Sequence, residues 1–236
     1  MTPLLVLAGG FGTRLRPAVS DVPKPLAPVG QRPYLHYLIR HWREQGAEEL
    51  IFLLHHQADT IVSFLSSEDR AGEFGSRSPR TITEPEPMGT GGAVAYAVRE
   101  LRLTGSFLVS NADTWLGTGI EALLNTPPAS MAIVEVTNSE RYGSVVTKGN
   151  KVVEFKEKSG SSGAGWINAG LYHLNAAMFA GWDGAPFSLE RDLFQGLAAA
   201  ELLSTVALDT DFIDIGVPED YYRFCRWVES GRAGQL

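Results

Sequence analysis

Short apolar runs alternate with amphipathic stretches along the first half of the chain. Four runs are predicted as strands, namely Leu4–Ala8, which we expect to be buried, Glu49–Leu54, Arg80–Thr83 and Phe107–Ser110. Three stretches between them are predicted as helices, over about Tyr34–Gln45, Asp59–Leu65 and Gly91–Leu101, and residues 66–78 are interpreted as a polar connection. This repetition predicts an α/β fold with a mostly parallel sheet, whose ligands bind at the carboxyl ends of the strands.

The second half of the chain changes character, because strand patterns follow one another with few helices between them. The predicted strands are Met131–Thr137, Gly143–Lys148, Val152–Phe155 and Gly165–His173. Such a pattern favours antiparallel hairpins, which we expect to lie over the open end of the parallel sheet and to hold a second substrate there. The Gly/Ser-rich residues 149–150 and 159–165 are too few to separate domains. We therefore predict one domain over residues 1–236, with a first half of about 1–115 and a second of about 130–220.

Composition narrows the class of protein. The chain has 236 residues, a net charge of −7 and one cysteine, Cys225. An acidic protein of this size suits a single α/β unit and argues against general nucleic-acid binding, which needs a basic face. A lone cysteine excludes a disulfide framework, and the five apolar residues near the N-terminus are too few for a signal peptide or a membrane span. The five histidines show no metal-binding spacing, and we expect a cytoplasmic protein without a membrane partner.

The segment Leu7–Leu15 places three glycines in four positions directly after the first predicted strand. Such glycines leave backbone N–H groups unshielded, and Arg14 and Lys24 add positive charge, so the segment is typical of an anion-binding loop. Two cations and a row of amides favour a triphosphate over a single carboxylate. A purely structural turn would explain the glycines but not the cations. A dinucleotide-binding fingerprint needs a third glycine where this chain has Leu15.

Together with Lys24-Pro25, the segment Leu7–Leu15 closely resembles the signature of the sugar-1-phosphate nucleotidyltransferases, which make nucleotide-activated sugars. The resemblance implies a Rossmann-like mixed sheet with helices on both faces and an antiparallel sugar-binding subregion. It makes the first half of the chain nucleotide-binding and the second half sugar-binding. It also implies that Arg14 and Lys24 are catalytic, binding the charges of the triphosphate and of the attacking phosphate. The nucleotide-binding residues implied in this loop are Ala8, Gly9, Gly10, Gly12 and Thr13.

The segment Glu84–Ala93 contains two prolines followed by glycines, which we expect to open a helix whose first amides are free. Alone it could be an ordinary strand-to-helix loop, but beside the first motif it resembles the family's base-reading segment. The resemblance assigns Glu84, Gly89 and Thr90 to the nucleotide. An ionised carboxylate only accepts hydrogen bonds, so Glu84 would favour the N–H donors of guanine over the carbonyl oxygens of uracil. Glu84 would equally suit capping the loop or facing solvent.

Asp113 follows the predicted strand Phe107–Ser110 and is interpreted either as a turn residue or as a metal ligand. The resemblance implies the metal role, although Ala112 stands where the family has glycine. An alanine there would disturb nucleotide fit if the glycine served a close approach or a positive φ angle.

The run Phe212–Tyr222 resembles another family signature, in which Asp214 is the second metal ligand. Pro218 suits the first turn of a helix, and we interpret Glu219 and Asp220 as charges that offset the helix dipole. Two carboxylates without a histidine suit Mg²⁺, completed by phosphate oxygens and water.

Three segments of the second half follow in the order and approximate spacing of the family's sugar site, namely Tyr142–Val145, Val153–Lys158 and Ile167–Gly170. The resemblance implies that Gly143, Glu157, Lys158 and Asn168 bind the sugar 1-phosphate. Without the resemblance, Glu154–Lys158 would be a solvated cluster of charges at a strand end.

Within the family, Glu140–Val145 and Phe212–Phe224 look most like the short D-glycero-α-D-manno-heptose 1-phosphate guanylyltransferases. The resemblance implies that GTP and this heptose 1-phosphate are joined into GDP-heptose with release of pyrophosphate. The attacking phosphate oxygen is already ionised, so no general base is needed. The alternatives are mannose 1-phosphate with GTP, N-acetylmuramic acid 1-phosphate with UTP, and a non-catalytic nucleotide-sugar sensor on the same fold.

Overall fold

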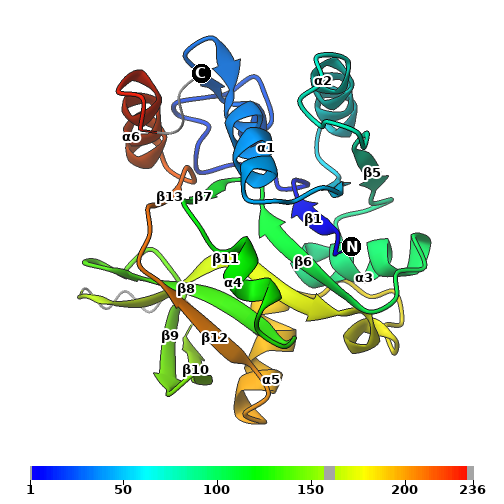
Figure 1. Cartoon of the computed structure of the whole chain (residues 1–236), viewed down its shortest axis with the longest axis vertical. Coiled ribbons are helices and arrows are strands. Elements are labelled where there is room, and N and C mark those ends of the chain that lie inside the picture. The colour runs from blue at the N-terminus through cyan, green and yellow to red at the C-terminus, as the bar shows by residue number, and fades with distance from the viewer. Residues whose placement is uncertain (1, 157–162, 233–236) are drawn as a thin grey trace.

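One mixed sheet runs through the molecule in the computed structural model, which describes residues 2–156 and 163–232 (Figure 1). Within these residues the sheet has nine strands in the order β5-β4-β1-β6-β11-β8-β12-β10-β9. Its first four strands are parallel, namely β5 (Arg80–Thr83), β4 (Leu50–Leu54), β1 (Leu4–Leu7) and β6 (Ser106–Asn111). The predicted strands of the first half are thus confirmed to within two residues.

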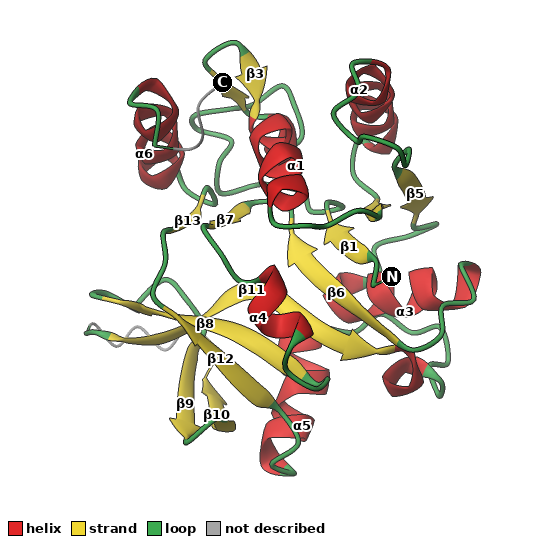
Figure 2. Cartoon of the chain, viewed as in Figure 1, coloured by secondary structure: helices red, strands yellow, loops and turns green. Residues whose placement is uncertain are grey.

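Helices cover both faces of this parallel part (Figure 2). Leu4 and Val6 of β1 pack into one core and Leu5 into the other, because successive side chains of a strand point to opposite faces. The first core contains residues of α1 (Tyr34–Glu44), α2 (Ala58–Arg70), α4 (Ile120–Leu124) and α6 (Pro218–Glu229). The second contains residues of α3 (Gly89–Glu100), the short helix η2 (Ala176–Phe179), the π-helix η3 (Leu189–Phe194) and α5 (Gln195–Ala199).

The antiparallel strands extend the same sheet, which corrects the expected layer of hairpins over its end. β11 (Gly165–Asn175) pairs with β6 on one side and with β8 (Ser130–Val136) on the other. The remaining strands are β12 (Ser204–Leu208), which is parallel to β8, then β10 (Lys151–Lys156) and β9 (Ser144–Lys148), which are antiparallel to their neighbours. β9 also pairs with β11 through Ile167 and Ser144. The open edge of β6 offers unpaired backbone groups, and β11 satisfies them directly. β12 was not predicted, because its five residues carry only a weak alternation.

Helix α2 continues to Arg70, so the expected polar connection begins five residues too early. Ile61, Leu65 and Glu68 are its buried residues. The polar residues between them face outward, which is how an amphipathic helix is built. Glu68 accepts from the ring of His36, with Nδ1 and Oε2 2.5 Å apart, and this buried pair links α2 to α1.

His36, Glu68 and Glu73 are close enough to share a cation, yet both acids already have protein cations beside them. Arg32 lies 3.7 Å from Glu68, and Arg40 lies 4.0 Å from Glu73. We therefore interpret this cluster as a structural link between α1 and α2.

Two small two-stranded sheets stand beside the large one. β2 (Pro28–Val29) pairs with β3 (Arg32–Pro33), after the single turn η1 (Lys24–Leu26), and β7 (Thr114–Leu116) pairs with β13 (Phe212–Asp214). These strands are too short for a period to be read from the sequence. Among the described residues, no helix has the length and apolar character needed to cross a bilayer.

Candidate active site

The glycine loop begins where β1 leaves the sheet. The N–H of Ala8 still donates to the carbonyl of Leu53 at 2.9 Å, so Ala8 remains part of the sheet. From Gly9 to Arg14, the backbone N–H groups have no acceptor within the described part of the chain. Gly12 has a φ of +59°, and a Cβ there would lie 3.0 Å from the Cβ of Lys24. The loop therefore offers a row of free amides, as an anion site requires.

The side chain of Lys24 lies beside this loop, and its ammonium bridges two carboxylates. Its Nζ lies 2.5 Å from Asp113 Oδ2 and 3.4 Å from Asp214 Oδ1. Burial alone would lower the pKa of Lys24, but the two carboxylates raise it, so the ammonium stays charged. Burial acts to raise the pKa of Asp113, yet Lys24, the hydroxyl of Thr114 and Arg14 together lower it. For Asp214, burial and the neighbouring Asp113 raise the pKa.

Short backbone contacts hold the two carboxylates together. Ala112 follows β6 and donates to the carbonyl of Leu7 at 3.0 Å, and the carbonyl of Asp113 accepts from Ile215 at 2.9 Å. The pairing of β7 with β13 places Thr114 opposite Asp214. Ala112 is not among the described residues with positive φ, so alanine at this position carries no left-handed strain. A positive φ angle is therefore not what this position requires, and close approach of a nucleotide is the ground for a glycine that stays a prediction.

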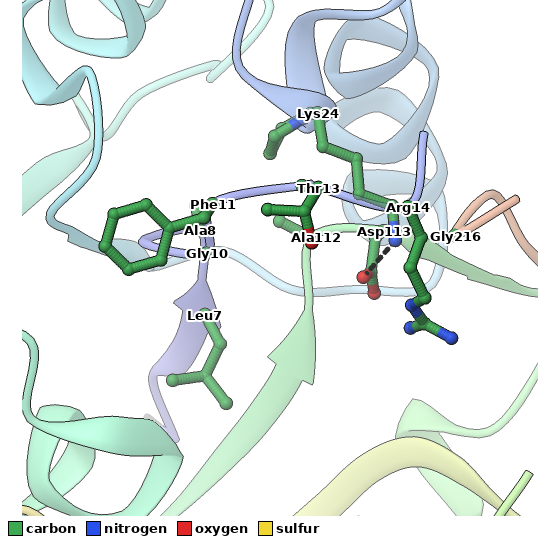
Figure 3. Close-up of a pocket in the computed structure, with 12 residues that line it drawn as sticks. Leu7, Ala8, Gly10, Phe11, Thr13, Arg14, Lys24, Ala112, Asp113 and Gly216 are labelled. Carbon is green, nitrogen blue, oxygen red and sulfur yellow. Dashed lines mark hydrogen bonds and ion pairs between the residues drawn. The ribbon is translucent and has the colours of Figure 1, made fainter. Parts of the chain in front are cut away.

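Arg14 lies on the open side of the same cavity, which has a volume of about 350 Å³. Figure 3 shows its guanidinium extending past Asp113, while a dashed line joins that carboxylate to the side chain of Lys24, which comes from η1. Within the described residues, Arg14 is exposed and has no ion-pair partner. A cation with no described side chain as counter-ion, beside a row of free amides, suits an anionic ligand.

A second hollow adjoins the loop and contains the predicted base-reading residues. It is lined by Gly9, Glu84, Gly89 and Thr90, among others. Glu84 Oε2 accepts from the N–H of Met88 at 2.9 Å, so the carboxylate caps this loop while still lining the hollow. Burial raises the pKa of Glu84 above its ordinary value.

Two of the first four amides of α3 have a protein acceptor, which corrects part of a prediction from the sequence. Gly91 and Gly92 both donate to the carbonyl of Phe187, at 2.9 and 3.2 Å. Gly89 has a φ of +71°, and a Cβ there would lie 2.5 Å from that same carbonyl oxygen. The glycines therefore let the segment around Phe187 approach the start of the helix closely. The N–H groups of Gly89 and Thr90 have no acceptor within the described part of the chain.

A third hollow of about 430 Å³ contains the described part of the predicted sugar site. Gly143 and Asn168 line it, and the N–H of Asn168 donates to the carbonyl of Gly143 at 3.2 Å. Arg14 and Asp214 line it as well. Glu157 and Lys158, the other two predicted sugar ligands, lie outside the described residues.

Asp113 lines all three hollows, so the loop, the base-reading segment and the sugar segment meet at one carboxylate. Every predicted site residue that the structure describes lines at least one of them. With Lys24 between Asp113 and Asp214, the centre combines oxygen ligands for a hard cation with positive charge for phosphates.

A family model described as "Nucleotidyl transferase" matches residues 4–230 of this chain. The chain belongs to the nucleotidyl transferase family. It is 32% identical over 227 residues to D-glycero-α-D-manno-heptose 1-phosphate guanylyltransferase of Aneurinibacillus thermoaerophilus, covering 92% of this chain and 94% of the relative. It is 34% identical to a probable mannose-1-phosphate guanylyltransferase of Oryza sativa subsp. japonica, covering 92% of this chain and 62% of that relative.

A crystal structure of HddC from Yersinia pseudotuberculosis superposes with a TM-score of 0.85 at 31% identity, covering 97% of this chain and 100% of HddC. HddC complexed with GMP-PN superposes with a TM-score of 0.83 at 30% identity, again covering 97% and 100%. The mixed sheet flanked by helices is thus the fold of a nucleotidyltransferase, and the resemblance seen in the motifs is confirmed.

Sequence reasoning missed two charged side chains of the nucleotidyltransferase that line the third hollow, Arg141 and Glu190. Arg141 donates to Asp220 Oδ2 at 2.6 Å, and Arg223 lies 3.2 Å from the other oxygen of Asp220. Asp220 lies in the first turn of α6, as expected of a charge that offsets the helix dipole. It is also only 3% exposed and pairs with two arginines, which was not expected. Arg141 lies in the segment Glu140–Val145, whose resemblance to the family could have indicated it as a site residue. No motif in the sequence indicated Glu190.

Proposed function

We propose that this enzyme joins GTP and D-glycero-α-D-manno-heptose 1-phosphate into GDP-heptose and releases pyrophosphate. The observation that carries the proposal is the meeting of three hollows at Asp113, with Lys24 bridging it to Asp214. One hollow has free loop amides for phosphates, one has a carboxylate suited to a base, and one has polar groups suited to a sugar. A transferase that joins two phosphorylated substrates needs these three regions at one point.

In this proposal the amides from Gly9 to Arg14 bind the triphosphate, together with Arg14. Lys24 neutralises the phosphate oxygens at the centre. Preorganised donors of this kind stabilise the charge that develops as the phosphoryl group is transferred. An oxygen of the sugar phosphate attacks the α-phosphorus, the bond to the bridging oxygen breaks, and pyrophosphate leaves with that electron pair. The attacking oxygen carries no proton at neutral pH, so no protein base is required.

Asp113 and Asp214 suit a divalent cation, for which we propose Mg²⁺. Two carboxylates that reach one ammonium, with no neutral nitrogen or sulfur ligand beside them, form an oxygen donor set. Such an ion supplies charge neutralisation for the phosphates of both substrates when bound.

Guanine is the proposed base because Glu84 lines the second hollow and, when ionised, only accepts hydrogen bonds. The N–H of Met88 holds its carboxylate in place. The names of the relatives support this choice, since both bacterial and plant relatives are guanylyltransferases. The complex of HddC with GMP-PN supports it as well. Heptose is proposed over mannose because the heptose enzyme matches over 94% of its length, whereas the mannose enzyme matches over 62%.

We further propose that residues 1–236 form one catalytic domain acting in the cytoplasm.

The test is pyrophosphate release by the purified protein with Mg²⁺, across four nucleoside triphosphates and a panel of sugar 1-phosphates. We expect GTP with the heptose 1-phosphate to give the highest kcat/KM. A preference for mannose 1-phosphate with GTP would show that the proposed sugar is wrong. A preference for UTP with N-acetylmuramic acid 1-phosphate would show that both proposed substrates are wrong. Binding of GDP-sugars without turnover on any pair would establish the sensor instead.

A further inference from the structure

Glu190 lies on the wall that the second and third hollows share. It is the second residue of η3, which follows the segment that contacts the start of α3. It lines both hollows and is half-buried. No cation lies within ion-pair distance of it in the described ranges 2–156 and 163–232. Burying an anion is costly unless polar partners satisfy it, so its contacts decide what it can bind.

One oxygen of Glu190 is fully used by the protein. Oε2 accepts from the hydroxyl of Thr90 at 2.7 Å and from the hydroxyl of Ser188 at 2.8 Å. Thr90 in turn accepts from the N–H of Leu189 at 2.9 Å, which fixes the direction in which its hydroxyl donates. These bonds hold the carboxylate in one orientation, with the occupied oxygen toward the base-reading segment.

The other oxygen has spare capacity and faces the sugar side. Oε1 has one long contact, 3.5 Å from the hydroxyl of Tyr172. That hydroxyl accepts from the amide of Asn168 at 2.8 Å, and Asn168 Oδ1 accepts from Gly170 at 3.0 Å. The amide group of Asn168 therefore already makes hydrogen bonds within the protein through both of its polar atoms. Oε1 of Glu190 has only its one long contact and is the more available acceptor.

We propose that Glu190 binds the sugar 1-phosphate, with Oε1 accepting a hydrogen bond from a ring hydroxyl, and so determines which sugar is used. The inference rests on the proposed function and adds a ligand to its sugar site. An acceptor-only group suits a neutral hydroxyl donor and would repel a phosphate, which Arg14 serves elsewhere in the same hollow. A site built to pair with a substrate hydroxyl rejects analogues that lack it, because its own polar group is then left unpaired.

Glu190→Gln is the sharpest variant, because the amide oxygen can keep both contacts of Oε2 while NH₂ replaces the acceptor Oε1. Asp192→Asn is the matched control. Asp192 lies in the same helix, accepts from the N–H of Ser188 at 2.7 Å, is exposed and does not line the hollows. Melting temperatures of both variants check that each is folded.

We expect Glu190→Gln to lower kcat/KM for the sugar 1-phosphate by about 10- to 100-fold, the range for a hydrogen bond to a charged group. The KM for GTP should stay within about twofold, and the control variant should match the parent. Monodeoxy sugar phosphates give a second, independent readout. One of them should lose a similar factor with the parent enzyme and lose little more with Glu190→Gln, since the paired groups are not additive.

Three results would overturn the inference while leaving the proposed function standing. They are an unchanged kcat/KM in folded Glu190→Gln, a rise confined to the KM for GTP, and full parental activity on every deoxy analogue. The last of these needs no variant. Failure of the parent enzyme to release pyrophosphate with any sugar phosphate would instead remove the proposed function, and this inference with it.

Discussion

At the scale of single residues, the two predicted catalytic cations are in different states. Lys24 is only 9% exposed and is neutralised by Asp113 and Asp214, whereas Arg14 has no counter-ion among the described side chains. Positive charge that is not used inside the protein is available to a ligand. Arg14 is therefore the cation whose partner has yet to bind, and its removal should cost activity without costing stability.

Arg14→Ala should lower kcat/KM for pyrophosphate release by about 10² to 10³, because one preorganised group typically contributes about 2.7 to 4 kcal/mol to the transition state. The melting temperature should stay unchanged, since the side chain is exposed. Arg16→Ala is the control, because Arg16 is also exposed and lines a separate small hollow behind the loop. Near-parental turnover in a folded Arg14→Ala protein would contradict the role of Arg14.

The sequence predicted most of the site at this scale, because the motifs are short and local. Arg14, Glu84 and the glycines lie within a few residues of predicted strand ends, where parallel strands present their ligands, and Lys24 was found through the Lys24-Pro25 motif. The ion pairs of Asp220 were not predicted, since its partner Arg141 is far away along the chain. A charge in the first turn of a helix cannot be told apart from a buried ion-pair partner without knowing what packs against that turn.

At the scale of elements, the start of α3 depends on a contact with a distant segment. The carbonyl of Phe187 accepts from Gly91 and Gly92, and Gly89 leaves the space that this carbonyl occupies. The predicted helix was confirmed, but two of its predicted free amides, those of Gly91 and Gly92, have this acceptor. Local sequence indicates that a helix begins here, whereas the partner of its first N–H groups comes from the second half.

Gly89→Ala should destabilise the protein more than Gly105→Ala, as measured by urea unfolding. Both glycines have positive φ, +71° and +76°, so each alanine incurs a left-handed backbone cost of about 1–2 kcal/mol. Only Gly89 adds a clash, which should cost about 1–3 kcal/mol more, because a Cβ at Gly105 meets open space. We also expect Gly89→Ala alone to raise the KM for GTP. Equal losses of stability would contradict the role of Phe187.

At the scale of the whole molecule, one acid from each half completes the centre. Asp113 follows β6 and Asp214 ends β13, and the β7–β13 pairing with the contact from Ile215 to Asp113 joins them. Neither half contains both proposed metal ligands. Metal binding should therefore depend on the assembled fold, as expected when ligands come from distant segments.

Chelation should abolish pyrophosphate release, and added Mg²⁺ should restore it, because charge neutralisation by a metal supplies several kcal/mol in such reactions. Asp214→Asn should need a higher Mg²⁺ concentration for half-maximal activity and should keep a lower maximum. Asp211→Asn is the control, since Asp211 is exposed and pairs with Arg232 away from the hollows. Full activity in excess chelator would exclude the proposed metal role of Asp113 and Asp214.

The sequence by itself determined the parallel half of the sheet, the glycine loop, the two acids and the family, because each depends on local periodicity or on short motifs. Tertiary structure decided how the antiparallel strands join β6, what occupies the first amides of α3, and which acids are buried. It also brought Glu190 beside Thr90 and Tyr172. These features depend on pairing between segments far apart in the chain, and no local pattern records such a pairing.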